Sequence, residues 1–396
     1  MKIKINNFIK AFNFENILIV FGILVSKSLY YETFGQNVLL IFMLGLVCLL
    51  GLYRALNNRL SISRKKILLY LLILLVIFIH PDKALSTTLV FTTLLTISLL
   101  FTSVIPLSRF TAIFYKFTKF LMIASLFRYL IIYAGIPSFL PDFVSIINNP
   151  YTNFVFFGIL ESQGTFYGIL RNNGLWWEPG AFQVIINLAF LLGLVFNKVS
   201  KRDYFIFLIV ILSTFSTAGI AIFSILSLVY FQNSVNYKVA LLFISLMGPV
   251  FAFSSYYQNV IDSKLSLDNA STNSRYKDLT LELRMFSEYP IIGSGLGNTE
   301  IVEEYKARYG YGTGSNGILL LLRNLGLFSI LIFIPVFYPG YIKKFDKKGK
   351  FLVSTALILI FFTQNFTAIL IFPLLTFYGA TNYRSSLKAD NSQILK

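Results

Sequence analysis

Apolar stretches of about the length of a membrane-spanning helix recur along this chain of 396 residues, and short charged turns separate them. A helix needs about 20 apolar residues to cross the hydrocarbon core of a bilayer. Because lipid cannot hydrogen-bond the backbone, the spanning segments are expected to be helices. Hydrophobic residues make up 56% of the chain and charged residues 13%, which excludes an ordinary soluble domain. The sequence predicts an all-α, polytopic integral membrane protein.

The apolar runs predict about twelve transmembrane helices in a single domain of residues 1–396. The expected spans are 15–31, 36–53, 66–80, 86–106, 119–135, 180–196, 203–216, 218–232, 238–255, 316–339, 350–365 and 367–382. Lys and Arg accumulate in short cytoplasmic loops, and cytoplasmic termini place most of the 34 basic residues on that side. The net charge of +17 then reflects topology and attraction to anionic lipid rather than nucleic acid binding.

Two long loops fall on the outer side of the membrane in this topology, over residues 136–178 and 256–315. The second is the more polar, and within it residues 274–288 are expected to form a short helix that ends before Pro290. Cys48 is the only cysteine and His80 the only histidine. We therefore expect no metal site and no cofactor.

A polar segment meets an apolar helix at Arg171 to Ala181, where Trp176, Trp177 and Glu178 stand next to one another. An arginine, a carboxylate and two flat aromatic faces at one water boundary are typical of a site for an anionic, sugar-bearing substrate. Two simpler explanations remain open. Glu178 could complement the dipole of the helix that Pro179 begins, and the tryptophans could belong to the interfacial aromatic belt.

Further candidate residues follow in and after the second loop. On the expected helix, Arg275, Asp278 and Glu282 share one side, and Asn316 opens the tenth span with Arg323 two turns deeper. An arginine so far inside a membrane usually faces a partner or a wet cavity. The glycines of residues 293–297 allow either a phosphate contact or a tight turn, and a tight turn is the expected structure.

The ordered set of motifs resembles the O-antigen and capsular polysaccharide polymerase/ligase family. The resemblance is carried by Trp176 to Gly180, the small-residue turn 216–219, Arg275 followed by residues 290–297, and Ser315-Asn316 with Gly326 beyond. It covers residues 170–330 in order and spacing. It implies a GT-C-like, metal-independent glycosyltransferase that polymerises repeat units carried on undecaprenyl pyrophosphate at the outer face of the bacterial inner membrane.

The resemblance also implies roles for the candidate residues. Arg171, Arg275 and Arg323 would bind the pyrophosphate, Glu178 would be the general base, and Trp176, Trp177 and Asn316 would contact sugar. The expected partners are the lipid-linked oligosaccharide, membrane lipid, a chain-length regulator and export machinery. Ser315 stands where many members have His, which weakens the ligase alternative and leaves the base unassigned by the motif. A lipid-linked oligosaccharide flippase or other transporter is the alternative from another class.

Overall fold

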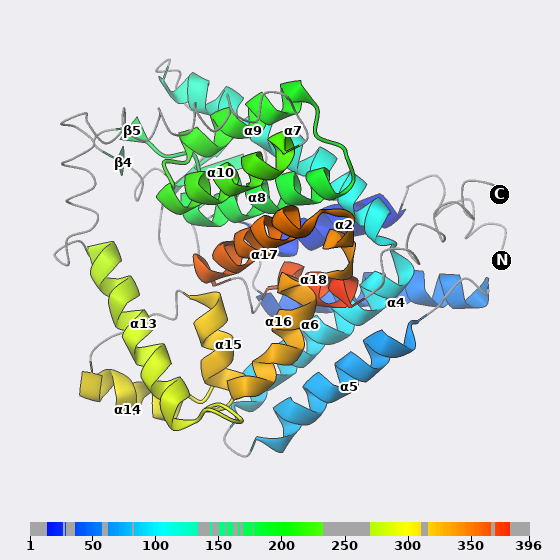
Figure 1. Cartoon of the computed structure of the whole chain (residues 1–396), viewed down its shortest axis with the longest axis vertical. Helices are drawn as coiled ribbons and strands as arrows, with labels where there is room; N and C mark the ends of the chain where they lie inside the picture. Colours follow the sequence, from blue (N-terminus) through cyan, green and yellow to red (C-terminus); the bar gives the residue numbers. More distant parts are fainter. Residues whose placement is uncertain are drawn as a thin grey trace.

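The structure is a computed structural model, and helices build nearly all of what it describes (Figure 1). The described residues are 14–26, 28, 36–57, 62–80, 83–133, 143–144, 150–154, 157–160, 165–166, 169–176, 178–232, 270–309, 316–365 and 369–380. The expected ninth span, 238–255, lies outside these ranges. The count of twelve spans therefore stays a prediction.

The helices before the first long loop are α2 (Phe14–Val25), α4 (Gln36–Leu56), α5 (Arg64–Ile79), α6 (Leu85–Val104) and α7 (Leu107–Tyr133). After it come α8 (Pro179–Val195), α9 (Lys201–Ser213), α10 (Thr217–Phe231), α13 (Ala270–Glu288), α14 (Thr299–Tyr309), α15 (Gly317–Leu325), η1 (Gly326–Ser329), α16 (Ile330–Phe337), η2 (Gly340–Lys344), α17 (Lys347–Phe362) and α18 (Ile371–Gly379). Within the described ranges, four helical stretches are long and apolar enough to cross a membrane: Asn37–Leu56, Leu85–Val104, Leu107–Arg128 and Gly317–Phe337. The chain is thus a helical membrane protein.

The central helix of the bundle is α8. Pro179 and every residue from Ala181 to Val195 are buried, and α7, α9, α10 and α17 pack around the helix. A helix that is mostly apolar all round is typical of a protein core or a membrane span, and α8 is covered by other helices on several sides. Because α8 lies inside the bundle, several other elements surround its start at Glu178.

Helix α7 corrects one expected boundary. The sequence suggests a cytoplasmic loop before a span at 119–135, but α7 is already helical from Leu107. Lys119 lies on this helix and forms an ion pair with the carboxylate of Asp203 at 2.5 Å. Tyr115, one turn earlier, also donates a hydrogen bond to Asp203 at 3.0 Å. Lys119 on this helix therefore has an acidic partner at the start of α9.

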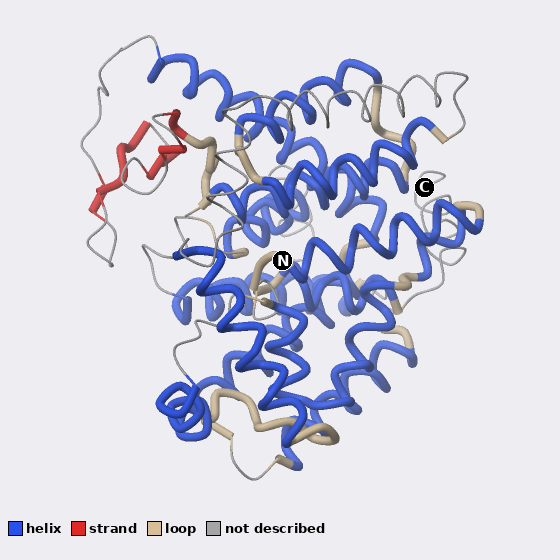
Figure 2. The backbone as a smooth tube through the Cα atoms, turned by 60° about the vertical axis from the view of Figure 1, so that its left-hand side comes forward, coloured by secondary structure: helices blue, strands red, loops and turns tan. Residues whose placement is uncertain are grey.

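The first long loop departs from the all-helical expectation. It contains an antiparallel sheet of β1 (Phe143–Val144), β2 (Pro150–Phe154) and β3 (Phe157–Leu160), and a hairpin of β4 (Thr165–Phe166) and β5 (Ile169–Leu170). Figure 2 shows these strands at one side of the helical body. Aromatic and β-branched residues dominate these segments, and such residues favour strands over helices.

The tenth expected span is broken rather than continuous. Helix α15 ends at Leu325, Gly326 takes φ +56°, and η1 leads into α16, which contains Pro335. The chain changes direction sharply between α15 and α16 (Figure 1). Such a φ favours glycine, so Gly326 supplies the bend. The span expected at 316–339 is helical and long enough to cross a membrane over Gly317–Phe337, and the sequence analysis did not predict its bend.

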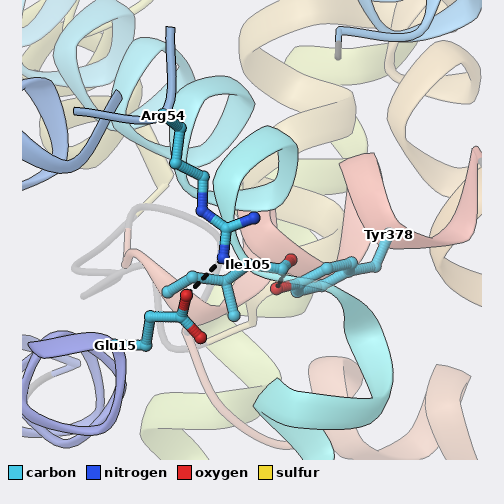
Figure 3. Close-up of polar contacts among 4 residues, drawn as sticks. All are labelled: Glu15, Arg54, Ile105 and Tyr378. Carbon is cyan, nitrogen blue, oxygen red and sulfur yellow. Dashed lines mark hydrogen bonds and ion pairs between the residues drawn. The ribbon is translucent and has the colours of Figure 1, made fainter. Parts of the chain in front are cut away.

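Polar contacts also fasten the end of the bundle far from Glu178. Arg54 of α4 forms an ion pair with Glu15 of α2, and both side chains are shown in Figure 3. In the same view, the hydroxyl of Tyr378 donates to the carbonyl of Ile105 at 2.9 Å. The first contact joins α2 to α4, and the second joins the end of α6 to the late helix α18.

Candidate functional site

One group of predicted residues lies where the chain enters α8, and we call Arg171, Asn172, Trp176 and Glu178 the α8 cluster. The amide of Asn172 donates to the hydroxyls of Ser125 at 3.1 Å and Ser213 at 3.0 Å. These bonds tie the cluster to α7 and α9. The segment before α8 is therefore a fixed part of the bundle.

Arg171 is half-buried at the edge of this cluster. Its Nε donates to the carbonyl of Thr214 at 3.1 Å, at the turn between α9 and α10. Nε is thus used to cap the end of α9, where a cation is favourable. Any phosphate contact would have to use the other nitrogens of the guanidinium.

Trp176 is a core residue and not an exposed stacking surface. Its side chain is fully buried, and its ring stacks on Phe182 with centroids 5.4 Å apart. The indole N–H donates to the carbonyl of Ser26 at 3.1 Å. The predicted sugar contact of Trp176 is therefore wrong for this structure, since protein covers the ring. Trp177 lies outside the described residues.

Glu178 is the N-cap residue of α8, with φ −149° and ψ 155°, and its side chain makes no capping hydrogen bond. Gly180 leaves room for Gln364, which follows α17. A Cβ built on Gly180 would lie 2.4 Å from the Gln364 side-chain nitrogen and 3.5 Å from Oε1 of Glu178. The half-buried carboxylate of Glu178 therefore lies near the side-chain amide of Gln364 at the start of α8.

Two polar residues one turn apart continue from Glu178 into the core of α8. The amide of Asn187 donates to Oε1 of Gln183 at 2.9 Å, and Gln183 donates to Thr363 at 3.4 Å. Both are fully buried. This pair was not predicted from the sequence, although two amide side chains one turn apart in an otherwise apolar span are a visible signal.

A second group surrounds the last turn of α15, and we call Asp278, Glu282 and Arg323 the α15 pocket. Helix α13 packs along α15, and both carboxyls interact electrostatically with the half-buried Arg323. Beside Arg323 lies a cavity of about 210 Å³. Its lining is largely apolar and comprises Thr87, Val90, Phe91, Leu94, Leu296, Gly297, Leu320, Leu321, Arg323 and Asn324.

Glu282 is the most unusual group in the α15 pocket. It is 1% exposed, and neither carboxyl oxygen has a hydrogen-bond partner among the residues that the structure describes. Burial is the main cause that raises the pKa of this carboxyl to about 8; the charge of Arg323 opposes the rise, and the charge of Asp278 adds a smaller contribution to it. The group is therefore poised to exchange a proton near neutral pH. The sequence placed it on the Arg275 face but gave it no role.

The glycine-rich turn supports α15 instead of forming a free phosphate cradle. The backbone N–H of Ser294 donates to the carbonyl of Arg323 at 2.7 Å, and that of Gly295 donates to Asn324 at 3.2 Å. These bonds satisfy carbonyls that the end of a helix leaves open. The tight-turn interpretation is confirmed, and it explains how α15 can end inside an apolar region.

Asn316 and Arg275 complete the predicted site residues. Asn316 is the N-cap of α15, and its Oδ1 accepts from the N–H groups of Ile318 and Leu319, both at 3.1 Å. Its amide oxygen is therefore used by the helix. Arg275 lies on α13 within the expected helix, and its side chain lies outside the described part of the structure.

The two groups do not form one arginine cluster in the described structure. Helix α17 contacts both α8 and α15 and lies between them in Figure 1. The predicted convergence of Arg171 with Arg323 is not observed among the described contacts. Within the same residues, no group of three or more His, Cys, Asp or Glu side chains could hold a metal ion.

Comparison with protein-family models, characterised proteins and solved structures finds no match to the chain.

Proposed function

We propose that this chain is a membrane glycosyltransferase that polymerises oligosaccharide repeat units linked to undecaprenyl pyrophosphate. The reaction would take place at the outer face of a bacterial inner membrane, with both termini in the cytoplasm. The supporting observation is Arg323, a half-buried guanidinium beside an apolar cavity of about 210 Å³. A lipid pyrophosphate offers a matching pair of features. Its phosphates suit the bidentate geometry of Arg, and its chain suits apolar walls.

The proposed chemistry is a displacement at the anomeric carbon of the growing chain. A sugar hydroxyl of the next unit forms the new C–O bond, the bond to pyrophosphate breaks, and the hydroxyl proton passes to a carboxylate. Arg323 would stabilise the charge on the departing pyrophosphate, with Arg275 as a further candidate contact, while Arg171 in the separate α8 cluster would contact another part of the substrate. Glu178 remains the proposed base, and Glu282 is a second candidate because its charge interacts with that of Arg323.

Polymerisation in vitro tests these roles. The purified protein is given one defined lipid-linked repeat unit, and chain length is followed for wild type, Glu178→Gln and Glu282→Gln. If Glu178 is the base, its variant loses polymerisation while Glu282→Gln retains it, and the reverse result assigns the base to Glu282. If both variants retain polymerisation, neither Glu178 nor Glu282 is the base, and a carboxylate base is removed from the proposal.

A gene deletion tests the proposed function in cells. Single repeat units, on the lipid carrier or at the surface, should replace long polymer, because chain extension would stop while unit synthesis continues. Complementation with the wild-type gene should restore the polymer. Undiminished long polymer in a strain without a redundant enzyme would contradict the proposal.

The bend at Gly326 favours a second candidate, a transporter of the lipid-linked unit. Broken membrane helices near a binding site are frequent in transporters, and α15 and α16 form such a break. Vesicles containing only this protein and a labelled lipid-linked unit distinguish the two functions. Translocation without chain extension would support the transporter, and extension without translocation would support the polymerase.

A further inference from the structure

Six large apolar side chains are exposed together where the glycine-rich turn meets the bend between α15 and α16. Tyr289, Ile291 and Ile292 come from the turn, and Leu327, Phe328 and Ile330 come from the bend. We call these six residues the apolar corner. The N–H of Leu327 donates to the carbonyl of Pro290 at 2.8 Å and joins the two halves. Ile291 is 63% exposed, although the sequence places it in the most polar loop.

Several polar groups of the turn's backbone are hydrogen-bonded to other parts of the protein. Besides the bonds from Ser294 and Gly295 to the end of α15, the Leu296 carbonyl accepts from Ala84 at 2.9 Å. The Gly293 carbonyl is hydrogen-bonded to His80 at 2.9 Å, and its N–H donates to Tyr289 at 3.0 Å. Irregular backbone is tolerated at membrane depth only where its polar groups are satisfied in this way.

The apolar corner is continuous with side chains that already face outward from apolar helices. The bonds to His80 and Ala84 place it against the end of α5 and the start of α6, where Ile79 and Leu85 are exposed. No charged residue occurs from 289 to 299 or from 324 to 342. A surface of this kind matches hydrocarbon, since an aqueous loop with so large an apolar patch would be unfavourable.

We propose that residues 289–297 enter the hydrocarbon layer as a re-entrant turn, and that the apolar corner is its lipid-contacting surface. The occupant of this surface is the acyl chains of the bilayer. The turn would thereby carry the end of α15, with Arg323 on it, below the membrane surface. This inference goes beyond the proposed function and holds whether the protein is a polymerase or a transporter.

Site-specific fluorescence in proteoliposomes tests the depth of the turn. In a Cys48→Ser background, an environment-sensitive probe is attached at Ile291→Cys and quenched by nitroxide lipids or by aqueous iodide. Leu75→Cys on α5, where the native side chain is 56% exposed, is the control for a lipid-facing position. Glu300→Cys at the start of α14 is the control for an aqueous position, since its native side chain is charged and exposed.

The probe at Ile291→Cys should be quenched by acyl-chain nitroxide as strongly as the probe at Leu75→Cys. It should also be protected from iodide, whereas the probe at Glu300→Cys should be quenched by iodide. Iodide quenching at Ile291→Cys with no nitroxide quenching would overturn the proposal. Protection from both quenchers would also overturn it, because a second copy or another protein would then cover the corner. Ile330→Cys, on the other half of the corner, gives an independent reading if the first variant does not fold.

Discussion

Glu282 shows how one residue can link folding to proton concentration. Its ordinary pKa is 4.5, and burial raises the pKa to about 8 in the folded chain. Between these values the folded protein retains a proton that the unfolded chain loses. The stability contributed by this carboxyl is therefore complete below the unfolded pKa and is lost as pH rises through the folded pKa.

The free energy of unfolding in detergent should accordingly fall as pH is raised from about 5 to about 9. Glu282→Gln should remove much of this fall and be more stable than wild type at the alkaline end, because the amide cannot ionise. Thermal unfolding across the pH range measures both. Glu304→Gln, on the exposed face of α14, is the control and should leave the pH dependence unchanged. Identical pH profiles for Glu282→Gln and wild type would contradict the assignment.

Trp176 gives a second prediction for a single residue, because its buried ring fills the space between Phe182 and the segment at Ser26. Trp176→Ala should lower the free energy of unfolding by about 3–5 kcal/mol, the usual cost of deleting a large aromatic side chain from a core. Trp176→Phe keeps much of the volume and should cost clearly less. Chemical unfolding of both variants measures the difference. Normal stability of Trp176→Ala with loss of sugar binding would restore the role predicted from sequence.

The sequence predicted which residue types belong to the site better than it predicted which of these residues lie close together. Arg323 was expected to face a partner or a cavity, and it has both. Trp176 was misplaced because an aromatic residue beside a polar segment has the same pattern at an interface and in a core. The closeness of Glu282 to Arg323 depends on how α13 packs on α15, which one sequence does not encode locally.

At the scale of elements, the break between α15 and α16 depends on Gly326. A Cβ at this position would lie 2.4 Å from the carbonyl oxygen of Ile291, and φ is +56°. Gly326→Ala should therefore destabilise the protein, through strain of about 1–3 kcal/mol from the backbone alone and further loss from the contact. Gly45→Ala on α4 is the matched control, since nothing lies within 4 Å of its added Cβ.

Thermal unfolding of the two glycine variants in the same detergent checks this account of the bend. The Gly45 variant should be as stable as wild type or more stable by up to about 1 kcal/mol, because alanine favours helix. Equal stability of both variants would mean that the bend at Gly326 is not required.

The elements themselves follow from local patterns with a few physical exceptions. The short helix expected at 274–288 is α13, and Pro290 follows its end as the sequence indicates. The span expected at 316–339 is present as Gly317–Phe337. Its bend at Gly326 was not predicted because hydropathy averages over a window and does not register a glycine at positive φ. The strands at 150–160 were missed because a short apolar run fits a strand and an interfacial segment equally well.

At the scale of the whole molecule, helix packing creates two polar groups in an otherwise apolar body. The α8 cluster lies at the start of α8 and the α15 pocket at the end of α15, and α17 contacts both helices. Each group contains one arginine that was predicted from the sequence. We therefore propose a different role for each group. The α15 pocket would hold the lipid pyrophosphate, and the α8 cluster would handle a polar part of the substrate.

The role of Arg323 is the central claim, and the rate of polymerisation with a defined lipid-linked repeat unit tests it most directly. Arg323→Ala should slow the reaction by about 100-fold or more, a typical cost of removing one donor to a charged transition state. Arg323→Lys should recover only part of the rate, because lysine keeps the charge but loses bidentate geometry. Arg284→Ala, exposed on the same helix as Glu282, should retain the wild-type rate. A wild-type rate for correctly folded Arg323→Ala would contradict the account.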